Sequence, residues 1–239
     1  TYASYVALMS EREVYVDGLL RAADDRALTP GWARLLDRVM APLRYPIHGL
    51  QMAGAYVAHL APGGRVALAG LFQAADEMRR VHRLAYRLRQ VQDARPTVGA
   101  ASRPVWQSDP IWQPLRELVE RLLATYDWGE AFAALNLAVK PAFDALFLDG
   151  FARLARRNGD DVLARLLGSF AEDAAWHRDW SRALVRTAVE DRPDNARALR
   201  EWTEKWRPWA LRAVAAFRQE FEGAPVPEPF GPILEEAGR

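Results

Sequence analysis

Apolar residues recur every three to four positions along most of the chain, which is the spacing of one face of an α-helix. Proline, glycine and short polar runs interrupt this pattern and divide it into segments. Runs with the strict alternation of a half-buried β-strand are nearly absent. The pattern therefore predicts an all-α protein with helices over residues 4–22, 32–40, 46–60, 66–94, 114–125, 128–157, 161–190 and 194–222.

Prolines set the expected ends of several helices. Pro42 is expected to end the helix of residues 32–40, and Pro46 to open the next one, where a missing backbone N–H is tolerated. Pro141 lies inside the helix of residues 128–157 and is expected to kink it or remove a backbone hydrogen bond. Residues 95–113 contain three prolines and predict an irregular connection.

The lengths of the connections predict the topology. Few residues separate helix 46–60 from helix 66–94, or helix 128–157 from helix 161–190, so each pair is expected to form an antiparallel hairpin. A long crossover joins the two hairpins, which is the ferritin-like, or ribonucleotide-reductase-like, arrangement with extra flanking helices. A generic helical bundle is about equally compatible with these lengths. We expect one domain over residues 1–222 and an irregular tail, rich in proline and glycine, over 223–239.

Composition excludes several classes of protein. The 239 residues include 32 basic and 31 acidic side chains, and this even balance argues against a dedicated nucleic-acid binder. The absence of cysteine excludes disulfide scaffolds, thiolate metal sites and cysteine nucleophiles, and fits a cytoplasmic protein. No apolar run is expected to reach the ~20 residues that a membrane-spanning helix needs. The chain begins at Thr1 rather than Met, so a preceding segment is compatible with the sequence.

A ferritin-like bundle makes a chemical prediction that the sequence can test. A di-iron centre in such a bundle needs a Glu from each of two helices and a Glu-x-x-His motif from each of the other two. Glu77 is followed three positions later by Arg80 instead of His. His177 is preceded three positions earlier by Ala174 instead of Glu. Each motif has therefore lost a different half.

The remaining two core helices supply no better ligands. Residues 46–60 contain no Asp or Glu, and the helix of residues 128–157 carries its acidic residues toward its ends, with Asn136 in its middle. A cation in place of a ligand also opposes metal binding, so Arg80 is expected to pair with Glu77 or another carboxylate. We predict no metal site in this chain, and expect Glu77, Arg80 and His177 to make internal polar contacts.

Five stretches resemble the β subunit of the hydroxylase of bacterial multicomponent monooxygenases, the group that oxidises toluene, phenol and alkenes. They are LRYPIHGLQM (43–52), LFQAADEMRR (71–80), YDWGEAF (126–132), LNLAVKP (135–141) and EDAAWH (172–177). The resemblance implies a metal-free, ferritin-like structural subunit, without catalytic residues of its own, beside an α subunit that holds the di-iron centre. It also implies a small γ subunit, two copies of each chain, an effector protein, and a reductase or Rieske ferredoxin that docks on the complex. NADH, FAD and iron–sulfur clusters would belong to those electron-transfer components. Family members usually carry a longer N-terminal segment.

Other residue patterns admit a functional and a structural interpretation. Trp202, Trp206 and Trp209 share one helix face, which suits an interface, although packing on the bundle is favoured. Trp106 and Trp112 lie in the crossover and are the better interface candidates, because loops run over the surface. An arginine run over residues 79–89 indicates an ion-paired helix face rather than a phosphate site.

The resemblance therefore implies a non-catalytic subunit of an NADH- and O2-dependent oxygenase that acts on small hydrocarbons. A self-contained, divergent metal oxidoreductase and a helical interaction protein unrelated to oxygenases are the alternatives. Metal content separates the first alternative from our interpretation, and the neighbouring genes separate the second.

Overall fold

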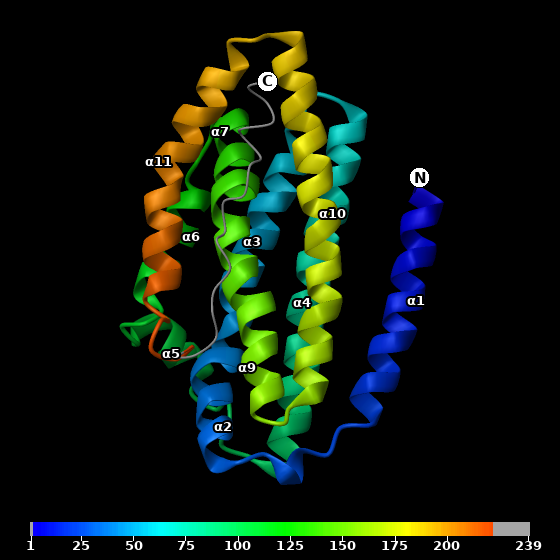
Figure 1. The fold of residues 1–239 in the computed structure, drawn as a ribbon, viewed down its shortest axis with the longest axis vertical. Coiled ribbons are helices and arrows are strands. Elements are labelled where there is room, and N and C mark those ends of the chain that lie inside the picture. Colours follow the sequence, from blue (N-terminus) through cyan, green and yellow to red (C-terminus); the bar gives the residue numbers. More distant parts are fainter. Residues whose placement is uncertain (1, 222–239) are drawn as a thin grey trace.

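The computed structural model of the protein describes residues 2–221. Most of these residues are helical, and none of them forms a strand. Four long helical segments lie side by side (Figure 1): α3 (Ala41–His59), α4 (Gly64–Ala94), a central helix over Trp128–Arg157, and α10 (Asp161–Asp191). The four segments form two antiparallel hairpins, and one long crossover joins the hairpins. This topology confirms the ferritin-like prediction. The predicted tail from residue 223 lies outside the described residues.

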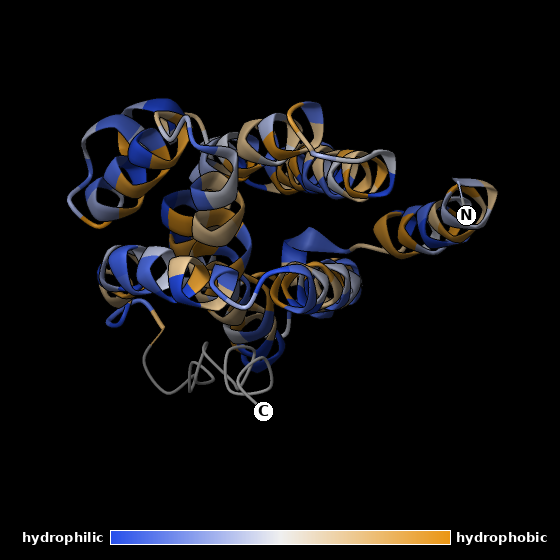
Figure 2. Cartoon of the chain, turned by 90° about the horizontal axis from the view of Figure 1, so that it is seen from above, coloured by the Kyte–Doolittle hydropathy of each residue, from blue (hydrophilic) through white to orange (hydrophobic). Residues whose placement is uncertain are grey.

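Further helices surround the quartet. They are α1 (Tyr2–Arg21), the 3-10 turn η1 (Asp25–Ala27), α2 (Pro30–Leu35), α5 (Ser102–Ser108), α6 (Gln113–Leu123) and α11 (Asn195–Ala215). Seen from above, α1 stands to one side of the bundle (Figure 2). The expected irregular connection over residues 95–113 is wrong in part, because α5 forms within it.

Small residues explain the tight hairpin of α3 and α4. A Cβ atom placed on Gly70 would lie 3.0 Å from the Cα of Ala58, and one placed on Gly54 would lie 3.6 Å from the Cβ of Ala74. The two backbones therefore approach closely over several turns. This contact brings the middle of α4 into the interior of the quartet.

The predicted helix boundary at Pro42 and Pro46 is wrong. The chain stays helical from α2 through the π-helical turn η2 (Leu36–Met40) into α3. Pro42 falls in the first turn of α3, where its missing N–H is tolerated, and Pro46 lies inside that helix. A π turn changes the register of the hydrogen bonds, which lets a helix continue past a proline without a break.

In the central helix, a π turn likewise precedes the turn that contains Pro141. It consists of α7 (Trp128–Ala133), η3 (Ala134–Val139), α8 (Lys140–Asp144), η4 (Ala145–Gly150) and α9 (Phe151–Arg157), and η3 and η4 are π-helical. Pro141 occupies the first turn of α8, directly after η3. By length and composition this helix could cross a membrane, contrary to the sequence-based expectation, but its apolar stretch is entirely buried inside the bundle.

An aromatic cluster closes the core on the side of the crossover. Trp112 is 0% exposed, and its ring centre lies 4.7 Å from that of Phe217 and 6.0 Å from that of Phe147. These rings come from the crossover, the turn after α11 and the central helix. The crossover and the C-terminal helix are thus fixed against the same face of the quartet.

Candidate functional site: the charged centre of the bundle

The interior of the quartet contains charged side chains where a hydrophobic core is expected. Glu77 and Arg80 lie one turn apart on α4, and both side chains are fully buried. Arg80 Nη1 donates to both carboxylate oxygens of Glu77 at 2.9 Å. The pairing predicted from the sequence is therefore confirmed.

The central helix adds a second cation and a second carboxylate. Lys140 donates to Glu77 and lies 3.5 Å from Asp144. Arg80 Nη1 also lies 3.4 Å from Asp144, and its Nη2 donates to the carbonyl oxygen of Phe170 on α10 at 2.9 Å. Burial alone lowers the pKa of Arg80, but the nearby Glu77 and Asp144 outweigh it and hold this pKa above its ordinary value. We call Glu77, Arg80, Lys140 and Asp144 the charged centre.

Lys140 and Asp144 are functional-site residues that the sequence analysis did not predict. The signal that could have found them is their spacing of four residues inside an otherwise apolar helix, because such a pair shares one helix face. A buried lysine needs a carboxylate partner, since an unpaired charge in the interior is costly. Glu77 and Asp144 together supply it.

His177 takes part in a neighbouring network around Asp76. His177 Nε2 lies 2.9 Å from Asp76 Oδ2, Trp176 Nε1 donates to the same oxygen at 3.1 Å, and the hydroxyl of Tyr5 donates to Oδ1 at 2.6 Å. Burial, followed by the charges of Lys140 and Arg80, lowers the pKa of His177 well below its ordinary value, so the ring is neutral and donates to Asp76. Its other ring nitrogen is buried without a hydrogen-bond partner.

Burial dominates the titration of Asp76. Burial, followed by the charge of the nearby Asp173 carboxylate, raises the pKa of this carboxyl to about 7. Hydrogen bonding from Tyr5 acts in the opposite direction. Asp76 is therefore a carboxyl that changes charge near neutral pH.

Asp173 links the charged centre to α1. Its carboxylate accepts from Arg12 on α1 and, at 2.8 Å, from Arg79 Nη1 on α4. Arg79 also pairs with Glu13 of α1 at 2.5 Å, and Arg83 pairs with Asp17 at 2.7 Å. The predicted ion-paired arginine face of α4 is thus confirmed, and the partners of Arg79 and Arg83 include carboxylates of the N-terminal helix.

Comparison with known proteins identifies the family of this chain. Residues 1–192 match the model of the methane/phenol/alkene hydroxylase family. The chain belongs to this family. It is similar to the β subunit of the hydroxylase component of the toluene-4-monooxygenase system of Ectopseudomonas mendocina, with 38% identity over 222 residues, 90% of this chain and 68% of that subunit.

Two further relatives of the family support the same assignment. The hydroxylase small subunit of propane 2-monooxygenase from Gordonia sp. (strain TY-5) is 26% identical over 87% of this chain, which spans 58% of that protein. A solved structure of toluene 4-monooxygenase with toluene in its resting active site contains a chain that superposes with a TM-score of 0.90 at 37% identity, covering 93% of this chain and 76% of that one. The relatives named as subunits are small or β subunits of hydroxylase components.

The residues at the middle of this family member do not fit a di-iron centre. Glu77 is already bound by the guanidinium of Arg80 and the ammonium of Lys140, and Ala174 offers no ligand atom where the second motif needs Glu. Lys140 and Arg80, which add to burial in lowering the pKa of His177, would repel a metal ion at its free ring nitrogen. No group of three or more candidate ligands is found within residues 2–221.

The tryptophans proposed as interface residues differ in accessibility. Trp112 is 0% exposed, so its ring packs inside this chain and the interface prediction for it is wrong. Trp206 is buried and donates to Glu130 at 2.8 Å. Trp106, Trp202 and Trp209 are half-buried and keep part of their surface accessible in this chain. The crossover is less superficial than its proline content suggests, because the aromatic cluster draws Trp112 inward.

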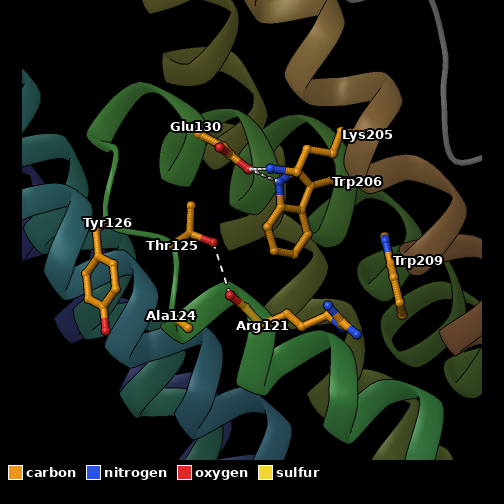
Figure 3. A pocket seen from close by; sticks show the side chains of 8 residues that line it. All are labelled: Arg121, Ala124, Thr125, Tyr126, Glu130, Lys205, Trp206 and Trp209. Carbon is orange, nitrogen blue, oxygen red and sulfur yellow. Dashed lines mark hydrogen bonds and ion pairs between the residues drawn. The ribbon is translucent and has the colours of Figure 1, made fainter.

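A surface cavity of about 370 Å³ lies between the end of α6 and α11 (Figure 3). Its charged groups are already paired: Lys205 Nζ donates to Glu130 at 2.7 Å, and Arg121 Nη2 donates to Glu117 at 2.9 Å. The guanidinium of Arg121 also covers the ring of Trp209 at 4.1 Å. This cavity therefore offers no free charge for a ligand.

Proposed function

We propose that this chain is the non-catalytic β subunit of the hydroxylase component of a di-iron multicomponent monooxygenase. The observation that carries the proposal is the charged centre, in which Arg80 and Lys140 hold Glu77 at the middle of a ferritin-like bundle. Two protein cations stand where the fold elsewhere binds metal. A bundle stabilised in this way keeps its shape without a cofactor, which suits a structural partner.

The chemistry then belongs to a larger partner. We infer that an α subunit with an intact pair of Glu-x-x-His motifs holds the di-iron centre, and that two copies each of α, this chain and a small γ subunit form a cytoplasmic hydroxylase. The complex would hydroxylate or epoxidise a small hydrocarbon with O2 and NADH, with a reductase or Rieske ferredoxin and an effector protein docking on it. The names of the toluene, propane and phenol relatives support this substrate class.

Contact with the partner would use surfaces that remain accessible. Trp106 and Trp209 are half-buried, and aromatic side chains of this kind are enriched in binding interfaces. Met52 and Leu71 expose 46% and 54% of their surface on α3 and α4. We propose these residues as candidate contacts with the α or γ subunit.

The test is to purify the tagged chain gently from its native host and to measure native mass and metal content per chain. We expect recovery with a larger partner and a small third chain, and all iron in the partner after the subunits are separated. Near-stoichiometric iron or manganese in this chain would contradict the proposal and indicate an independent metal oxidoreductase. Recovery of a lone, metal-free chain would contradict the assembly while leaving the fold unchanged.

A further inference from the structure

An apolar pocket lies where α7, the end of α10 and the start of α11 meet, away from the charged centre. Its volume is about 180 Å³. The lining consists of Trp128, Gly129, Phe132, Leu184, Val185, Ala188, Asn195, Ala198, Leu199 and Trp202. Asn195 is the one amide among them, and its Nδ2 donates to the carbonyl oxygen of Ala188 at 2.9 Å. The lining therefore contains no charged side chain.

Small residues create the space and aromatic residues wall it. Ala188 on α10 and Ala198 on α11 leave room that larger side chains would fill. Trp128 and Phe132 stand on the opposite wall with their rings nearly parallel, at an interplanar angle of 10° and 5.9 Å between centres. Ring faces and edges of this kind prefer another aromatic ring as a neighbour.

The walls are held in place independently of any ligand. Trp128 Nε1 donates to the carbonyl oxygen of Val57 at 2.8 Å, so the polar edge of this ring is satisfied. A Cβ atom on Gly129 would lie 2.8 Å from the ring of Trp202, which shows how closely that ring rests on the backbone. The pocket is therefore formed before a ligand arrives, as most small-molecule sites are.

We propose that this pocket binds a small uncharged aromatic molecule with one ring, of the size of benzene or toluene. Its volume is close to the roughly 150 Å³ of apolar protein cavities that take up benzene, and its mouth opens to solvent. A carboxylate, a phosphate or an ammonium ion would find no partner in the lining.

The first test locates the ligand. Crystals of the chain, purified with the subunits that accompany it, are soaked with bromobenzene, and the bromine is located by its anomalous scattering. We expect a peak between Trp128 and Ala188. Occupied bromobenzene sites elsewhere, with none at this pocket, would overturn the proposal.

The second test uses a matched pair of variants on α10. Ala188→Leu fills the pocket, whereas Ala183→Leu makes the same change at an exposed position of the same helix. Toluene uptake is measured from its loss from the headspace above the protein solution. We expect affinity at this site to fall at least tenfold in Ala188→Leu and to stay within twofold in Ala183→Leu. Equal uptake by the two variants would contradict the proposal, and Ala198→Leu fills the pocket from α11 if Ala188→Leu does not fold.

Discussion

The charged centre and the apolar pocket are both built against α10, and they fill the space beside this helix in opposite ways. His177, next to the charged centre, and Ala188, in the pocket, are separated by roughly 16 Å along the helix axis at 1.5 Å per residue. At the centre, every carboxylate meets a cation or a hydrogen-bond donor. At the pocket, small side chains leave a volume that the protein itself does not occupy.

The difference shows how a bundle can lose one kind of site and keep room for another. Carboxylates cannot serve as metal ligands when they are already paired with arginine or lysine side chains. An apolar space is not closed by such substitutions, since it has no ligand atoms to lose. The two regions therefore predict very different responses to mutation.

The largest effect is expected at the charged centre. Glu77→Ala leaves the buried cations Arg80 and Lys140 with Asp144 as their one remaining shared carboxylate, and should lower the free energy of unfolding by about 3–5 kcal/mol. Glu77→Gln keeps the shape and one acceptor, so its loss should be smaller. Urea denaturation of the purified chain with its native subunits measures both variants. Unchanged stability in Glu77→Ala, or metal lost with it, would contradict the structural role of this residue.

A glycine pair tests the rigid wall of the pocket. Gly129→Ala places a methyl group 2.8 Å from the ring of Trp202 and should lower the free energy of unfolding by about 1–2 kcal/mol. Gly168→Ala is the matched control, because no atom lies within 4 Å of the new methyl group inside α10. It should raise stability by roughly 0.5–1 kcal/mol through helix propensity. Thermal denaturation should therefore move the two melting temperatures in opposite directions, and parallel shifts would contradict the close contact.

The pH dependence of stability tests the carboxyl of Asp76. Its pKa is raised from 3.8 to about 7 in the folded protein, so between these values the folded state holds a proton that the unfolded state has released. Stability should consequently fall as pH rises from about 4 to 7 and should level off above that range. Asp76→Asn should reduce this decline, and Asp173, whose pKa is also raised by burial, should account for part of the remainder. An identical slope in the variant would contradict the assignment to Asp76.

The smallest effect is expected for a charge pair in solvent. Arg89 and Asp93 on α4 lie 3.3 Å apart with side chains 73% and 68% exposed. Arg89→Ala should change the free energy of unfolding by less than about 0.5 kcal/mol, because water screens exposed pairs. Measured beside Glu77→Ala, it shows how strongly burial sets the value of a charge. A loss of unfolding free energy as large as that of Glu77→Ala would contradict the expected difference between exposed and buried ion pairs.

Much of the fold could be predicted from the sequence because helix periodicity and connection lengths are local signals. The two hairpins and their crossover follow from them. The boundary at Pro42 could not be predicted, since it depends on the π turn η2, whose altered hydrogen bonding has no clear sequence mark. Helix α5 was missed because prolines and small polar residues dominate its surroundings.

The part of the candidate site that lies on α4 could be predicted from the sequence. The part that other helices contribute could not. Glu77 and Arg80 are three residues apart, so their pairing follows from helical spacing alone. Lys140 reaches Glu77 only after two distant helices pack together, which no local pattern encodes. Trp112 was misjudged for the same reason, because its aromatic neighbours come from other parts of the chain.

The attachment of α1 has a consequence for cooperativity. The first half of this helix is held by the stacking of Tyr5 on Phe72, with ring centres 3.9 Å apart, and by the contacts of Tyr5 and Arg12 with Asp76 and Asp173. If α1 detaches, water reaches both carboxylates and two donors to them are lost. Local opening of α1 should therefore loosen the middle of α4 at the same time. In amide hydrogen exchange, these two segments should exchange as one cooperative unit, although more than fifty residues separate them along the chain.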